Sequence, residues 1–120
     1  MNEKYYIMIP ASGACELFIW KYKSVGEFLL ERDVNMFKRA MVYDDLVVFY
    51  NDQRSIGDLY NHIASQLAGD RVIYGDVYIL LGEQGTCDTD SFIPFDAKSA
   101  VNYIDTITKR YFHVVNTFRF

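Results

Sequence analysis

The residues best suited to chemistry in this sequence are a few polar side chains near its middle. Asn51, Asp52, Asn61 and His62 follow a strongly apolar segment, and α/β proteins commonly place ligands at the ends of their strands. Such a cluster predicts a small polar binding or catalytic site. The alternative is structural, because Asn and Asp favour turns by hydrogen bonding to nearby backbone groups. The residue types favour this structural interpretation.

A thiol nucleophile is a second possible chemistry, with Cys87 activated by His62 or His113. However, Cys87 is followed by Asp88 and Asp90, and negative charge nearby raises a thiol pKa. A raised pKa disfavours the thiolate, which is the reactive form. We therefore predict no catalytic cysteine–histidine pair.

The same acidic loop offers oxygen ligands for a divalent cation, from Glu83 and the segment 88–90. It lacks the glycine and the distal glutamate of a calcium-binding loop. The two cysteines, Cys15 and Cys87, form no CxxC or zinc-binding pattern. We expect a solvated loop, no metal and no cofactor. Reduced thiols and no secretory signal indicate a cytoplasmic protein.

Charge argues against nucleic acid as a partner. The net charge is −4, and the basic pairs Lys38–Arg39 and Lys109–Arg110 are far apart in the sequence. Proteins that bind nucleic acid usually show a basic surplus or a clustered basic stripe. The segment Trp20–Lys23 alternates aromatic and basic residues, as in a surface on which bases stack, but in an acidic chain it fits an ordinary strand end better.

The composition is that of one globular domain. The chain has 120 residues, of which 51% are hydrophobic and 17% aromatic. No segment approaches the ~20 apolar residues of a membrane span, so we expect no membrane association. Tyrosine is enriched at protein interfaces, so a partner-binding face would explain the 10 tyrosines, and a tyrosine-rich rim of the core is the other explanation.

The two longest apolar runs, Leu46–Tyr50 and Val72–Leu81, predict the central strands of the sheet. They are rich in β-branched and aromatic residues and are bounded by Asp, Asn and Gly. Between them, Asp58 is expected to cap a helix to Leu67, with Leu59, Ile63 and Leu67 on its buried side.

Shorter patterns predict the remaining elements. A glycine-containing loop between two apolar runs indicates a hairpin, and Ser24 with Glu27 forms a capping box that begins a helix. The predicted segments are strands at Lys4–Pro10, Cys15–Trp20, Met36–Val42 and Phe112–Phe120, with the longest helix at Asp96–Tyr111. Together they predict a single α+β domain with a mixed sheet of about five to six strands and two to three helices, mainly on one face.

Several sparse positions resemble a family of uncharacterised small proteins carried by bacterial phages, plasmids and conjugative elements. The resemblance rests on Tyr50–Asp52, on Asn61 with Ala64, on Gly75 and Gly82, and on the acidic start at Asp96. It covers roughly Tyr43–Lys109. This chain has Leu59 where members often have proline, and His62 where they have a basic residue. The resemblance implies an accessory protein of a mobile element and no established reaction.

Two functions therefore stand as expectations. The first is a non-enzymatic binding protein that acts on a host protein or a small ligand, as a monomer or a homodimer. The second is an enzyme with a weakly marked site around Asn51, Asp52, Asn61 and His62. An enzyme should place these groups in a concave pocket, whereas a binding protein should present an aromatic surface.

Overall fold

The structure is a computed structural model of the chain. It describes residues 3–11, 15–31, 37–42, 46–51, 59–69, 71–82 and 92–112, with the backbone alone at 37–42, 51 and 111–112. The predicted turn at 43–45, the acidic loop at 83–91 and residues 113–120 of the predicted closing strand Phe112–Phe120 lie outside these residues. Phe112 is described, and it is helical and not part of a strand.

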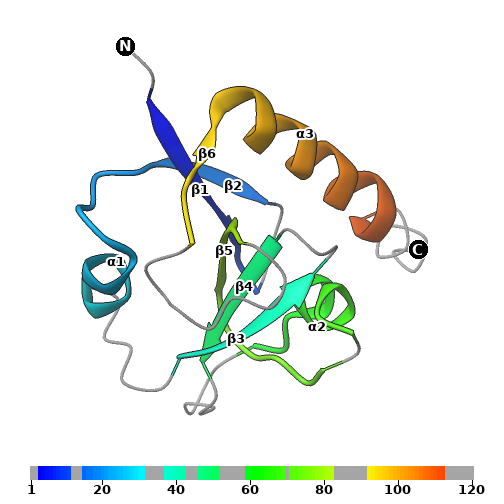
Figure 1. Cartoon of the computed structure of the whole chain (residues 1–120). Helices are drawn as coiled ribbons and strands as arrows, with labels where there is room; N and C mark the ends of the chain where they lie inside the picture. The colour runs from blue at the N-terminus through cyan, green and yellow to red at the C-terminus, as the bar shows by residue number, and fades with distance from the viewer. Residues whose placement is uncertain are drawn as a thin grey trace.

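A six-stranded sheet forms the centre of the molecule (Figure 1). Its order is β2-β1-β5-β4-β3, and β6 extends the sheet by pairing with β1. Every pairing among the described strands is antiparallel. The strands are β1 Lys4–Ile9, β2 Glu16–Ile19, β3 Phe37–Val42, β4 Leu46–Asn51, β5 Val77–Leu81 and β6 Phe95–Asp96.

The α+β class is thus confirmed, with an antiparallel sheet in the described residues where a mixed one was predicted. In the described residues, three helices accompany the sheet: α1 Val25–Glu31, α2 His62–Leu67 and α3 Ala97–Ile107, the last followed by the π-helical turn η2 Thr108–Phe112. Helices α2 and α3 pack on one face of the sheet, and α1 packs on the other. The helices therefore lie mainly on one face, as predicted.

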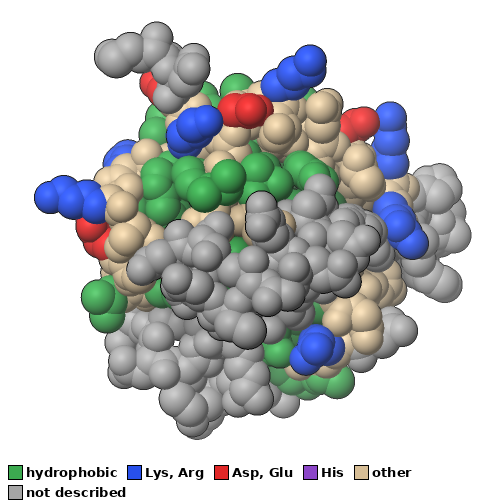
Figure 2. Space-filling model, viewed as in Figure 1, with side chains coloured by type: hydrophobic (Ala, Val, Ile, Leu, Met, Phe, Trp, Pro, Cys, Tyr) green, Lys and Arg blue, Asp and Glu red, His purple; other side chains and the backbone are tan. Residues whose placement is uncertain are grey.

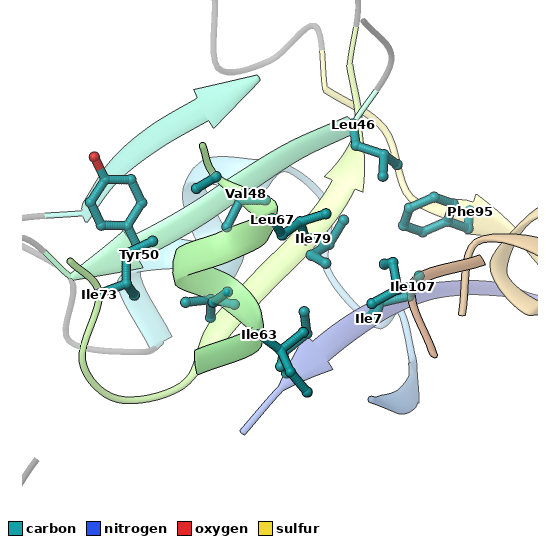
Figure 3. Packing of buried hydrophobic residues seen from close by; sticks show 14 of the residues in the cluster. Ile7, Leu46, Val48, Tyr50, Ile63, Leu67, Ile73, Ile79, Phe95 and Ile107 are labelled. Carbon is teal, nitrogen blue, oxygen red and sulfur yellow. The ribbon is translucent and has the colours of Figure 1, made fainter. Parts of the chain in front are cut away.

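The core has two parts, one on each face of the sheet. On the α2 and α3 side, Ile63 and Leu67 of α2 pack against Val48 and Ile79 of the central strands (Figure 3). On the other side, Phe28 of α1 is fully buried within a cluster of largely aromatic side chains. Strands β4 and β5 are covered on both faces, which explains their nearly continuous apolar sequence.

Local sequence signals position the first part of the chain. Strands β1 and β2 form the predicted antiparallel hairpin, with Tyr6 opposite Phe18. At the start of α1, the Glu27 amide donates to Ser24 Oγ at 3.1 Å, as a capping box requires. The Glu27 carboxylate reaches back to the amide of Lys23 at 3.4 Å, one residue earlier than the standard pattern.

The helix predicted from Asp58 begins later than expected. Its N-cap is Asn61, and Leu59 lies outside it with 59% of its surface exposed. Leu59 is therefore not part of the buried helical stripe, and Asp58 lies outside the described residues. Gly69 ends the segment at a φ of 80°, a left-handed conformation that glycine adopts without steric cost.

The predicted strand Val72–Leu81 is also shorter than expected. It begins at Val77, whereas Val72 is 71% exposed. Gly75, which the sequence marks as an interruption, has a φ of 79° and turns the chain before β5. Tyr74 just before it forms an isolated bridge with Tyr60, next to α2. The apolar run thus supplies a strand and, before it, a segment that is tied to α2.

The predicted C-terminal helix is confirmed. Asp96 is its N-cap, accepting from the Ser99 amide at 2.8 Å, and Ala100 and Ile107 are buried against the sheet. Two hydrogen bonds from the Ser99 amide and hydroxyl lower the pKa of Asp96, because they stabilise its ionised form. Asp96 therefore begins the helix and also ends β6, a strand that the sequence did not reveal.

Candidate functional site

Asn61, a predicted site residue, is buried and bonded within the protein. Its Oδ1 accepts from the Ala64 amide at 3.0 Å, and its Nδ2 donates to the carbonyl oxygens of Ile9 at 3.0 Å and Gly75 at 2.9 Å. Both amide hydrogens are thereby used. Asn61 holds α2, β1 and the segment before β5 together, and its side chain has no donor left for a ligand.

Its neighbour His62 points elsewhere. His62 is exposed, and its ring meets the ring of Tyr60 edge-on, with centroids 4.4 Å apart. Asn61 and His62 are therefore adjacent in sequence, but the first is buried and the second is exposed. They do not form one polar pocket.

The other two predicted site residues lie at the end of β4. Asn51 is the last residue of that strand, with its backbone alone described, and Asp52 lies outside the described residues. The preceding Tyr50 is buried, and its hydroxyl accepts from Arg71 Nη1 at 3.2 Å. This end of the sheet therefore carries a tyrosine–arginine contact that the sequence did not predict.

A second internal contact stabilises the same region. Ser65 of α2 is buried, and its Oγ accepts from the Ile73 amide at 3.0 Å. The Ile73 carbonyl accepts from the Asn61 amide at 2.9 Å. Buried polar groups are normally paired in this way, so the region follows the structural interpretation of its asparagines.

The thiol chemistry finds no support in the described residues. Cys15 is half-buried against the core, and burial raises the pKa of its thiol to about 11. At neutral pH it is a thiol and not a thiolate, so it is a poor nucleophile. Cys87 and His113 lie outside the described residues. No cluster suited to a metal ion occurs within the described part of the chain.

An open groove lies between β2 and α1, on the face of the sheet that α1 covers. Its volume is about 490 Å³. Tyr6 of β1 and Phe18 of β2 form its apolar floor, with their rings stacked at a centroid distance of 5.3 Å and an interplanar angle of 15°. The ring of Phe28 of α1 packs edge-on against the ring of Tyr6, with centroids 4.8 Å apart, and so supports this floor.

The strand beside this groove is an exposed edge of the sheet. All four residues of β2 are exposed, and three of them are consecutive apolar residues: Leu17, Phe18 and Ile19, at 37%, 38% and 46%. Edge strands of natural proteins usually carry charges, proline or a bulge that discourage pairing. In β2 the sole charged residue is Glu16, at its beginning.

Backbone groups at this edge point outward in a regular pattern. The Trp20 amide donates to the Lys4 carbonyl at 2.7 Å, so these two residues form a hydrogen-bonded pair. Hydrogen-bonded and non-bonded pairs alternate along an antiparallel ladder. With Tyr5 opposite Ile19 in the register, the amides and carbonyls of Leu17 and Ile19 point away from β1. These groups are placed to pair with a further strand.

The rim of the groove is charged. Glu27 and Glu31 of α1 line it, together with Lys21 that follows β2. Residues four apart lie on the same face of a helix, so the two carboxylates are neighbours. Neither carboxylate forms an ion pair with another described side chain, and Glu27 accepts only from the Lys23 backbone amide. The α1 side of the groove is therefore acidic.

A smaller groove of about 350 Å³ is lined by Trp20, Phe92 and Ile93. Hydrophobic side chains also form a band across the face shown in Figure 2, with charged side chains above and beside it. The sequence did not predict these surfaces. The signal was present in the apolar run at 17–19 and in the Glu27–Glu31 spacing, but both also occur in ordinary hairpins and helices.

Comparisons of the chain with protein-family models, curated proteins and solved structures find no match. None of the helices in the described residues is long and apolar enough to cross a membrane. The function is therefore inferred from the geometry of the protein's own side chains.

Proposed function

We propose that the protein is a non-enzymatic binding protein that holds a segment of a host protein in the groove between β2 and α1. The observation that carries this proposal is the edge strand β2. It combines outward-pointing backbone groups at Leu17 and Ile19 with an aromatic floor at Phe18, next to an open groove. Protein segments are often bound in this way, by adding a strand to an open sheet edge.

Other occupants fit the groove less well. The phosphates of a nucleic acid would meet the carboxylates of Glu27 and Glu31, which repel them. A small ligand is usually enclosed on most sides, whereas this groove runs along an exposed edge of the sheet. An extended peptide uses both the backbone groups and the apolar side chains of such an edge.

The alternative function is an enzyme centred on Asn51, Asp52, Asn61 and His62. It is weakened because Asn61 is committed to Ile9, Gly75 and Ala64, while His62 lies apart from it on the surface. We also propose a cytoplasmic location, from the predicted reduced thiols, and a role as an accessory factor of a phage or another mobile element, which the sequence resemblance alone implies.

Affinity purification from host lysate tests this function. The tagged protein is compared with Ile19→Asp, which adds a charge to the exposed edge, and the retained proteins and small molecules are identified by mass spectrometry. The matched control is Val101→Asp. Like Ile19, Val101 is an exposed β-branched aliphatic residue, with 57% of its surface exposed, but it lies on α3.

We expect a host protein that is retained by the unaltered protein and by Val101→Asp but lost from Ile19→Asp. Circular dichroism and thermal melting show that each variant is folded. Retention that is equal for all three proteins would contradict a role for β2. Retention of a small molecule alone, with turnover of that molecule, would favour the enzyme.

A further inference from the structure

From the charge and the hydrogen-bonding pattern of the groove, we infer which kind of segment it binds: an extended peptide in which Lys or Arg alternates with Val, Ile or Leu, paired with the free edge of β2. This inference rests on the proposed function and adds the chemistry of the partner. It follows from three observations at β2 and α1, which concern backbone groups, side-chain faces and charge.

The backbone requires an extended partner. Leu17 and Ile19 each direct an amide and a carbonyl away from β1. Successive residues of a strand point their backbone groups to opposite sides, so a partner strand contributes every second residue to this ladder. A helix cannot satisfy these groups, because its own amides and carbonyls are bonded internally.

The two faces of the edge then select different side chains. Phe18 stacks on Tyr6, which contacts Phe28 of α1, so Phe18 lies on the α1 face of the sheet. Side chains alternate along a strand, so those of Leu17 and Ile19 point to the other face, together with their cross-strand partners Ile7 and Tyr5. A bound strand alternates between the same two faces. One set of its side chains therefore lies beside Leu17 and Ile19, where aliphatic residues suit the apolar surface. The other set lies over Phe18 and faces α1.

Charge decides the identity of this second set. The α1 side of the groove carries Glu27 and Glu31, and Lys21 is the one cation among its described lining residues. A Lys or Arg of the peptide can lay its aliphatic stem along Phe18 and bring its charged end to the glutamates. An Arg also gains by stacking on the ring. The same cation relieves the repulsion between the two carboxylates on neighbouring turns of α1.

Synthetic peptides test the inference with the full-length protein. The probe is a short fluorescent peptide that alternates Lys or Arg with Val or Ile, and binding is measured by fluorescence anisotropy. A first control replaces each basic residue by Glu. A second has the same composition but a shuffled order, which removes the alternation. We expect the alternating basic peptide to bind about tenfold or more tightly than either control at low salt.

The protein variants test each contact separately. Glu31→Gln should weaken binding of the basic peptide by about two- to fivefold, an effect that high salt reduces. Asp105→Asn is the matched control, because it also removes one exposed carboxylate, on α3, and it should leave binding unchanged. Ile19→Pro removes an amide that β1 does not use and should abolish binding, whereas Ile19→Ala should only weaken it.

N-methylation of the peptide, one residue at a time, tests strand pairing most directly. Methylation at alternate residues should abolish binding, and methylation between them should have little effect, because only every second amide faces β2. An effect that is equal at all positions would overturn strand addition. Tighter binding of the Glu peptide, or a Glu31→Gln variant that binds as well as the unaltered protein, would overturn the basic specificity.

Sedimentation of the protein without peptide tests the competing occupant. A dimer that Ile19→Pro converts to a folded monomer would show that a second copy covers β2, and it would overturn the inference. The proposed function can be judged apart from all these results. If the peptides fail to bind while a host protein is still lost from Ile19→Asp, the binding function stands and the peptide chemistry is wrong.

Discussion

The side-chain amide of Asn61 donates to the backbone carbonyl of Ile9 at 3.0 Å, across 52 residues of sequence. This bond joins the start of α2 to the end of the N-terminal strand β1. The same amide group also holds Gly75, just before β5. One buried side chain thus connects three segments that are distant in sequence, which gives it a larger role in stability than a helix cap has alone.

Replacing Asn61 by Ala should lower the free energy of unfolding by about 3 kcal/mol. The loss combines an N-cap with two hydrogen bonds to backbone carbonyls, of which the one to Ile9 is buried. Urea unfolding measures this change. His62→Ala is the control and should change stability by less than about 0.5 kcal/mol, because His62 is exposed. Equal effects of the two substitutions would contradict the structural role of Asn61.

Replacing Asn61 by Asp separates the cap from the donors. The new carboxylate can still accept from Ala64, but it cannot donate to Ile9 and Gly75 while it is ionised. Because the folded state disfavours its charged form, we expect the folded-state pKa to be raised. The variant should therefore regain stability relative to the unaltered protein as the pH falls. A stability difference that is independent of pH would refute this.

Phe28 should be the most sensitive residue of the aromatic cluster. It is fully buried, with ring centroids 4.8 Å from Tyr6, 5.0 Å from Trp20 and 5.1 Å from Tyr22. Phe28→Ala should cost about 3–5 kcal/mol of unfolding free energy and disturb the floor of the groove. Leu30→Ala, on the same helix but 77% exposed, should stay within about 0.5 kcal/mol.

Cys15 should react slowly with thiol reagents in the folded protein. Its pKa is raised to about 11 by burial, so little thiolate forms at pH 8, whereas unfolding in urea should make it react at an ordinary rate. The slowly reacting thiol should be absent from Cys15→Ala, which would identify that thiol as Cys15. Fast and complete reaction of both thiols in the native protein would show that Cys15 is accessible.

The same raised pKa predicts a loss of stability at alkaline pH. An unfolded cysteine ionises near the ordinary value of 9.0, but the folded one ionises at about 11, so the unfolded state binds fewer protons between these values. The contribution of Cys15 is therefore complete below pH 9 and is lost as the pH rises towards 11. As the pH rises from 9 to 11, the Tm of the unaltered protein should therefore fall relative to the Tm of Cys15→Ala.

Asp96 should stabilise α3 through its charge as well as its cap. Asp96→Ala should lower the Tm at pH 7. Asp96→Asn should lower the Tm less, because Asn can still accept from the Ser99 amide. The pKa of Asp96 is lowered in the folded state, so its contribution is present above the ordinary value of 3.8 and is lost as the pH falls through the folded-state value. The Tm difference between Asp96→Ala and the unaltered protein should therefore narrow in acid.

Local signals predicted the elements that they control directly. Ser24 and Glu27 begin α1, Asp96 begins α3, and the apolar runs around Tyr6 and Phe18 form the hairpin, because each depends on residues within a few positions. Such short-range hydrogen bonds can be recognised from residue type and spacing. The α+β class follows from these elements.

Tertiary contacts decided the rest. Both Asp58 and Asn61 could cap a helix, and the sequence could not show that Ile9 and Gly75 would lie beside Asn61. The groove was missed for a similar reason. Whether Leu17 and Ile19 are covered depends on which strand lies at the edge, and strand order is a property of the whole chain.

The strand order also has a consequence for how the chain folds during synthesis. β1 pairs with β2 along one edge and with β5 and β6 along the other, so Met8 pairs with Tyr78 of β5, and Lys4 pairs with Asp96 of β6. While a ribosome makes the chain, the early hairpin has no neighbour along its inner edge until β5 emerges. Contacts so distant in sequence make folding slow, and the nascent hairpin exposes Ile7 and Ile9 throughout this interval. We expect chaperones to engage the nascent chain before the β5 segment leaves the ribosome.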